Sequence, residues 1–193
     1  MAQKGRMRST GKRRERPPLD DESLNELALL YVARFATTRA KLAAYLARKV
    51  RERGWHSDAA PDLEQVAASF AERGYIDDAA FAISKSRSLT ARGYGARRVE
   101  VSLRAAGVGE EEGRDARALA RTEAAAAALR FAERRRIGPF AGAPVDPRQR
   151  ERALAAMIRA GHGFDLARAV VEMPPGPPPD ADELSERLGL SRN

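Results

Sequence analysis

One long stretch of the chain, residues 62–138, contains no proline and is rich in alanine, leucine, arginine and glutamate. Helix interiors tolerate proline least of all residues, and those four residues are among the strongest helix formers. Aromatic residues make up only 6% of the 193 residues, so a core must be built mainly from aliphatic side chains. The sequence therefore predicts an all-α fold.

Apolar residues recur at helical spacing in short blocks near the N-terminal end of the chain. The first block contains Leu24, Leu27, Tyr31 and Phe35, and the second contains Leu42, Leu46 and Val50. Such spacing is typical of one buried face on an amphipathic helix, and Thr37-Thr38 is a suitable N-cap pair for the second helix. Helices this short are not stable alone in water, so we expect them to pack on one another.

Three glycines that end predicted helices, Gly54, Gly107 and Gly161, are spaced by 53 and then 54 residues. An apolar residue lies four positions before each of them: Val50, Leu103 and Met157. A fixed period of this length is typical of helical repeat proteins. The sequence therefore predicts three tandem three-helix repeats, 19–73, 74–120 and 121–172, stacked side by side as an elongated, curved modular array. The second helices of neighbouring repeats are expected to lie parallel to each other.

Both ends of the chain differ in composition from the middle. Residues 1–18 carry seven basic residues against Glu15 alone, have no apolar periodicity, and are predicted to be a disordered basic tail. Residues 173–193 begin with a proline-rich linker and continue into an acidic C-terminal segment. This segment either folds back over the basic surface as a cover or hangs free.

Several classes of function lack the residues that they need. The chain has no cysteine, which excludes a disulfide framework, a thiolate zinc site and a cysteine nucleophile. We interpret the only two histidines, His56 and His162, as polar turn residues, and Asp77-Asp78 as a helix cap. No phosphate-binding loop and no long apolar run occurs. We expect a soluble cytoplasmic protein that is not an enzyme and needs no membrane, metal or cofactor.

Basic residues gather in two clusters, each with six cations and one opposing acid. The first basic cluster is Arg39, Lys41, Arg48, Lys49, Arg51 and Arg53, opposed by Glu52. The second basic cluster is Lys85, Arg87, Arg92, Arg97, Arg98 and Arg104, opposed by Glu100. A smaller third group is Arg130 and 134–136, opposed by Glu133. If the first two fuse into a stripe, they could bind phosphates or an acidic protein groove; the alternative is a solvated face of mixed ion pairs.

Two aromatic residues lie beside these clusters. Tyr94, within Gly93-Tyr94-Gly95, and Trp55 could stack on bases, although Trp55 is more often a core residue at such a helix end. We therefore predict that Tyr94 joins the two basic clusters in one binding surface.

Two segments of the chain together resemble the central motif of the regulatory protein RecX family. They are 72–82, with the letters ERGYIDDAAFA, and 92–99, with the letters RGYGARRV, followed by Leu103 and Gly107-Val108. The resemblance extends over about residues 22–172. It implies a modular helical protein that binds in the groove of the RecA–DNA filament and restrains ATP hydrolysis, strand exchange and coprotease activity. It also implies binding to single- and double-stranded DNA, and no catalytic residues.

These observations lead to two hypotheses of different classes. The first is a monomeric regulator of RecA in DNA repair and recombination, which uses the two basic clusters and Tyr94 as its RecA- and DNA-binding surface. The alternative is a sequence-nonspecific DNA-binding protein that works without RecA, through the basic tail and the stripe. An enzyme is the third reading, and no residue pattern suggests a substrate.

Overall fold

The computed structural model describes residues 17–190, which fold into helices with no strand apart from an isolated bridge. The all-α fold is confirmed. The helices are α1 (Asp21–Val32), α2 (Arg39–Arg53), α3 (Leu63–Glu72), α4 (Asp78–Ala91), α5 (Ala96–Ala105), α6 (Arg114–Thr122), α7 (Ala124–Arg135), the 3-10 turn η1 (Gly138–Phe140), α8 (Pro147–Arg159), α9 (Phe164–Glu172) and α10 (Ala181–Arg187). Residues 1–16 of the predicted tail lie outside the described part.

The helices gather around three separate hydrophobic cores. Leu42, Leu46 and Phe70 are buried among α1–α3, and Val99 and Leu103 are buried among α4–α6. A third core lies among α7–α9 and also takes up α10. We call these sets the first, second and third helix groups; the repeat boundaries remain predictions.

Side chains at the helix starts satisfy N–H groups that a helix cannot satisfy itself. Thr38 accepts a hydrogen bond from the Lys41 backbone, and the Asp77 carboxylate accepts one from the Ala80 backbone at 2.8 Å. The capping role is therefore confirmed for Asp77. The neighbouring Asp78 is buried and instead accepts hydrogen bonds from Arg39.

The apolar face predicted for the first helix is wrong at its end. Leu24 is fully buried, but Phe35 is 57% exposed. The helix stops at Val32, so Phe35 lies in the turn beyond it and no longer follows the helical spacing.

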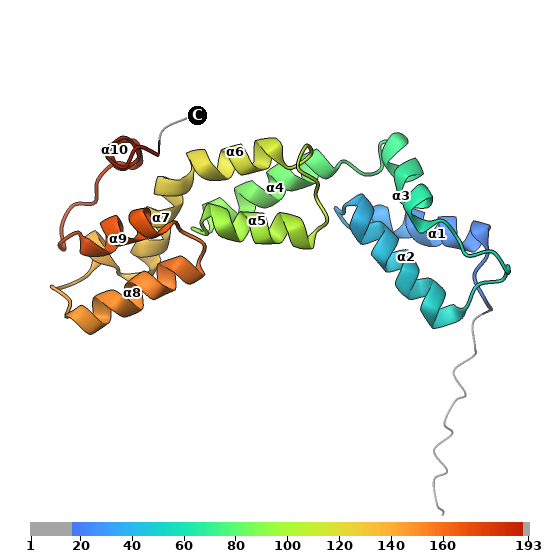
Figure 1. The fold of residues 1–193 in the computed structure, drawn as a ribbon, viewed down its shortest axis with the longest axis horizontal. Helices are drawn as coiled ribbons and strands as arrows, with labels where there is room; N and C mark the ends of the chain where they lie inside the picture. Colours follow the sequence, from blue (N-terminus) through green and yellow to red (C-terminus); the bar gives the residue numbers. More distant parts are fainter. Residues whose placement is uncertain (1–16, 191–193) are drawn as a thin grey trace, which may run out of the picture.

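The second helices of the three groups follow one another end to end along the long axis of an elongated molecule (Figure 1). The end of α8 meets the start of α5, and the end of α5 meets the start of α2. The expectation that these helices lie parallel and side by side is wrong. The result is a line of helices rather than a stack.

At the first joint, α2 begins against the turn that ends α5. The Thr38 hydroxyl donates to the Ala106 carbonyl at 2.5 Å, and the Arg39 backbone and Nε both donate to Asp78 at 3.0 Å. Gly107 lies so close to Ala40 that a Cβ atom on it would overlap the Ala40 Cβ. A glycine is therefore required here for the helix ends to meet.

At the second joint, α5 begins against the turn that ends α8. The Gly95 backbone donates to the Ala160 carbonyl at 3.0 Å, and the Arg97 backbone donates to the Gly161 carbonyl at 3.1 Å. A Cβ atom on Gly161 would overlap the Arg98 backbone nitrogen. The ring of His162, only 1% exposed, lies 3.2 Å from the Gly93 carbonyl, so this histidine is a buried joint residue rather than a simple turn residue.

Gly54, the remaining glycine of the series, ends α2, and within residues 17–190 no other second helix begins against it. Instead the Leu19 backbone donates to its carbonyl at 2.9 Å, and the Leu19 carbonyl accepts from the His56 backbone at 2.8 Å. The Arg53 guanidinium donates to the Pro17 carbonyl. The segment Pro17–Leu19 therefore covers this end of the line.

The acidic C-terminal segment neither hangs free nor covers the two basic clusters. Helix α10 packs on the third core through Leu184, which is fully buried. Within residues 17–190, no ion pair joins α10 to either cluster.

The glycine joints predict a difference between two alanine substitutions. Gly161→Ala combines a positive φ of 95° with overlap against Arg98, whereas Gly74→Ala has a similar φ of 76° and open space around the new Cβ. Urea unfolding should show a loss of about 1 to 2 kcal/mol for Gly74→Ala, from backbone strain alone. Gly161→Ala should lose about 3 kcal/mol or more. Equal losses would contradict the joint.

The buried histidine predicts a pH dependence of stability. Burial lowers the pKa of His162 from 6.5 to about 4, and the hydrogen bond with the Gly93 carbonyl opposes this only in part. His162 therefore binds a proton below pH 6.5 in the unfolded chain, but only near pH 4 in the folded chain. The neutral side chain of His162 therefore contributes about 3 kcal/mol to the free energy of unfolding. This contribution is complete above pH 6.5 and is lost as the pH falls toward 4.

Urea unfolding at pH 7.5 and pH 5 checks this dependence. His162→Gln should show a smaller loss on acidification than the unsubstituted protein, and His56→Gln, which changes an exposed side chain, should keep the full loss. An unchanged loss in His162→Gln would assign the effect to other groups.

Candidate partner-binding surface

Several cations of the first basic cluster are engaged within the protein. Arg39 forms ion pairs with Asp78 at 3.0 Å and with Glu112 at 2.5 Å, and its pKa is raised, first by the hydrogen bond to Asp78. Lys49 and Arg48 pair with Glu52 at 2.6 and 3.7 Å. Arg39 is therefore a joint residue more than a free cation.

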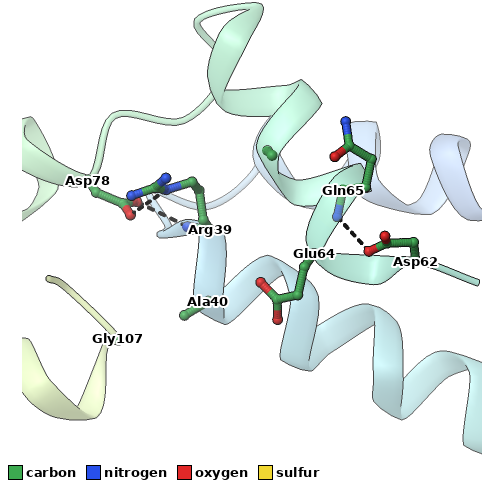
Figure 2. Close-up of a pocket in the computed structure, with 8 residues that line it drawn as sticks. Arg39, Ala40, Asp62, Glu64, Gln65, Asp78 and Gly107 are labelled. Carbon is green, nitrogen blue, oxygen red and sulfur yellow. Dashed lines mark hydrogen bonds and ion pairs between the residues drawn. The ribbon is translucent and has the colours of Figure 1, made fainter.

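Figure 2 shows the pocket beside Arg39, a hollow of about 400 Å³ between the first and second helix groups. Three carboxylates line it, from Asp62, Glu64 and Asp78, with Arg39 as the cation. Asp62 is occupied as the cap of α3, because it accepts from the Gln65 backbone at 2.9 Å. This side of the first joint is thus acidic and unsuited to phosphates.

The second basic cluster is engaged in part. Arg104 pairs with Glu100 at 2.5 Å, and Arg117 of α6 pairs with the other oxygen of the same carboxylate at 2.7 Å. The hydrogen bond from Arg117 is the largest cause of the lowered pKa of Glu100. Arg92 donates to the Ser88 carbonyl at 3.0 Å. Glu100, the single acid that opposes this cluster in the sequence, therefore forms ion pairs with two arginines.

Four cations of the two clusters remain exposed, and their side chains form neither an ion pair nor a hydrogen bond with another residue of the range 17–190. They are Arg51 on α2, Arg87 on α4, and Arg97 and Arg98 at the start of α5. These side chains have the freedom that a partner with negative charge requires.

The two clusters meet at one place, around Phe81. The Lys41 ammonium lies 4.6 Å from the centre of the Phe81 ring. Its pKa is lowered, first by burial and then by the charge of Lys85. Lys41 and Lys85 therefore approach each other across the first joint, and a binding stripe made of both clusters stays a prediction.

The two aromatic residues proposed as stacking partners have structural roles. The Trp55 indole donates to the Ala59 carbonyl at 2.8 Å and packs against the first core. Tyr94 is half-buried and packs against both the second and third cores, with Arg92 and Arg98 over its ring. Its ring thus helps to hold the second joint, and its role in binding stays a prediction.

Sequence reasoning missed the aromatic residues that flank the first basic cluster. The Tyr31 and Tyr45 rings stack at 4.2 Å, and the Phe35 ring lies 5.2 Å from Tyr31. Arg48 and Lys49 lie over Tyr45. A signal was present in the spacing, because Lys41, Tyr45 and Lys49 are four residues apart and share one helix face.

Two kinds of feature are absent from residues 17–190: a metal-binding group of side chains and a membrane-spanning helix. Within residues 17–190, no three acidic or histidine side chains gather in a way that could hold a metal ion. None of the helices in this range combines the length and the apolar character that a membrane span requires. The features that remain are an extended surface, exposed arginines and a groove at the first joint.

Comparisons with solved structures show the fold. Two RecX crystal structures each superpose with a TM-score of 0.55. The one from Lactobacillus salivarius has 16% identity and covers 78% of this chain and 94% of that chain. The other, titled as regulatory protein RecX, has 19% identity and covers 77% of this chain and 71% of that one. No protein-family model matches the sequence.

Comparisons with curated sequences show the family. A protein of Myxococcus xanthus named regulatory protein RecX is 32% identical over 177 residues, which cover 85% of this chain and 95% of the relative. A protein of the same name from Halorhodospira halophila is 32% identical over 166 residues, which cover 86% of this chain and 92% of the relative. With this identity over most of both lengths, and with matching helical folds, the chain belongs to the regulatory protein RecX family.

Proposed function

We propose that this protein regulates the RecA recombinase by lying in the groove of the RecA–DNA filament and restraining its ATP hydrolysis, strand exchange and coprotease activity. The end-to-end line of α8, α5 and α2 is the observation that carries the proposal (Figure 1). At about 1.5 Å per residue, these helices together span roughly 55 Å, more than the diameter of a small domain. One molecule can therefore contact more than one subunit of a polymer.

Regulation of this kind needs binding, and no bond-making chemistry. A filament that cycles between ATP states changes the spacing of its subunits, and a rod bound across several subunits favours the state in which all its contacts are made. The exposed arginines on α2, α4 and α5 supply contacts to carboxylates or phosphates along the rod. The proposed regulation requires no catalysis, metal or cofactor.

We propose that the protein acts as a monomer. Pro17–Leu19 covers the end of α2, and α10 adds its buried Leu184 to the third core. Segments of the same chain thus occupy places where another copy could otherwise pack.

A second candidate function is DNA binding without RecA. The observation that favours it is the tail, in which residues 1–16 carry seven basic residues against one acid. The tail joins the described structure at Pro17, whose carbonyl is held by Arg53 at the end of α2. The basic residues of 1–16 would add contacts to phosphates whether RecA is present or not.

The first prediction concerns α5. The double change Arg97→Glu with Arg98→Glu should weaken inhibition of the single-stranded-DNA-dependent ATP hydrolysis of RecA by about tenfold or more, because two exposed contacts become repulsive. Hydrolysis is titrated with protein below one molecule per RecA. The matched control is Arg114→Glu with Arg121→Glu, which makes the same charge change at exposed positions on α6.

Folding of both double variants is verified by circular dichroism. If the α5 and α6 variants inhibit equally, α5 is not the surface that meets the filament. If neither the variants nor the unsubstituted protein inhibits RecA at any ratio, the proposed function itself is wrong.

The second prediction separates the two functions by removing residues 1–16 and keeping Pro17–Leu19, because Leu19 caps α2. For the RecA regulator, DNA binding should weaken while most of the inhibition of ATP hydrolysis is kept. For the independent DNA binder, most DNA affinity should vanish. Fluorescence anisotropy over a range of salt measures this, with a slope near −0.9 per phosphate contact on duplex DNA.

A further inference from the structure

A groove of about 430 Å³ crosses the first joint, away from the acidic pocket of Figure 2. One wall is the segment before α2, with Ala36 and Thr37, and the other is the segment before α4, with Tyr75 to Asp77. The floor comes from α4, through Phe81, Ser84, Lys85 and Ser88. Both helix groups therefore contribute to one groove.

Two exposed rings and two lysines lie in the lining of this groove or next to it. Tyr75 on one wall is 54% exposed, and Phe35, next to Ala36 on the other wall, is 57% exposed. Lys41 and Lys85 are only partly exposed, and Lys41 lies over the Phe81 ring. Burial and the charge of Lys85 lower the pKa of Lys41, so an anion between these two lysines would be stabilised.

This set of groups suits a peptide better than a nucleic acid. A single strand is bound by a positively charged groove that follows its phosphate backbone, together with rings on which successive bases stack. Among the residues that line this groove, Lys85 is the one cation and Asp77 is an acid, so the groove offers no continuous row of cations for a phosphate backbone. A carboxylate on a short side chain can reach between the lysines while neighbouring apolar side chains cover the exposed rings.

The polar groups of the walls agree with this reading. The Thr37 side chain is 6% exposed, and its hydroxyl has no hydrogen-bond partner within the described structure. A buried polar group without a partner is unfavourable, and a bound peptide that reached it would supply the missing bond. The Asp77 carboxylate, which also lines the groove, accepts from the Ala80 backbone as the cap of α4 and forms no ion pair with either lysine within residues 17–190.

We propose that this groove binds a short acidic peptide segment of a partner protein, with an aspartate or glutamate carboxylate between Lys41 and Lys85 and apolar side chains against Tyr75 and Phe35. The proposal deepens the proposed function, on which it rests for the identity of the partner as a filament protein. The binding itself is tested without RecA, so the two can fail separately.

The probe is a set of fluorescein-labelled dodecapeptides in which glutamate alternates with leucine, phenylalanine or tyrosine, with a matched set in which lysine replaces glutamate. Fluorescence anisotropy with the full chain should detect binding of glutamate peptides and none of lysine peptides. Lys85→Met should weaken binding by about tenfold or more. The matched control is Arg121→Met, which removes one positive charge from an exposed position on α6 outside the two basic clusters and should change binding by less than about twofold.

A variant that keeps all charges guards against an effect of net charge. Tyr75→Ala removes an exposed ring and should also weaken peptide binding, with the far-ultraviolet circular dichroism unchanged. Equal losses for Lys85→Met and Arg121→Met would overturn the groove, and so would a glutamate set that binds no better than the lysine set. If a dT12 oligonucleotide displaces the peptide and depends on Lys85 in the same way, the groove is a nucleic-acid site instead. Peptide binding by a protein that never inhibits RecA would leave the groove standing and remove the proposed function.

Discussion

The whole arrangement depends on the contact between a glycine that ends one second helix and the start of the next. Gly107 meets Ala40 and Gly161 meets Arg98, in each case so closely that a Cβ atom would not fit. At the second joint, the Ala160 and Gly161 carbonyls accept from the Gly95 and Arg97 backbones. Helix ends leave such carbonyls and N–H groups without partners, so placing the ends together satisfies both sets at once. The molecule is elongated because these hydrogen bonds join its helices end to end.

The two joints are built from different interactions, and this difference bears on function. The second joint buries His162 against Phe131 and joins backbone to backbone. The first relies on Thr38 and on ion pairs of Arg39, whose side chain is 44% exposed. The partner carboxylate of Asp78 is buried, so loss of its ion pair with Arg39 would leave a buried charge without a partner, and the first joint depends on this charged contact. The groove proposed to bind a peptide lies at this joint, so a ligand bound there would contact both the first and the second helix groups.

The sequence alone predicted the helices, because apolar spacing and the absence of proline are local signals. It also identified Gly107 and Gly161 as equivalent, but a period does not contain the direction in which units are placed. That direction depends on contacts such as Ala40 with Gly107, between residues far apart in the chain. The binding surface was harder to predict for the same reason. Arg39 is paired by Asp78 and Glu112 from the second helix group, which no count of neighbouring charges includes.

What remains after this pairing argues for binding that is spread along the rod. The free cations lie on three helices of two helix groups: Arg51 on α2, Arg87 on α4, and Arg97 and Arg98 on α5. Each exposed charge contributes modestly and is screened by salt, so affinity has to come from several contacts made together. Contacts that must be made together are sensitive to the spacing of the sites they reach. If the protein binds a filament as proposed, a rod of this kind would distinguish between states that differ in subunit spacing, whereas a compact binder with one patch would contact both states equally.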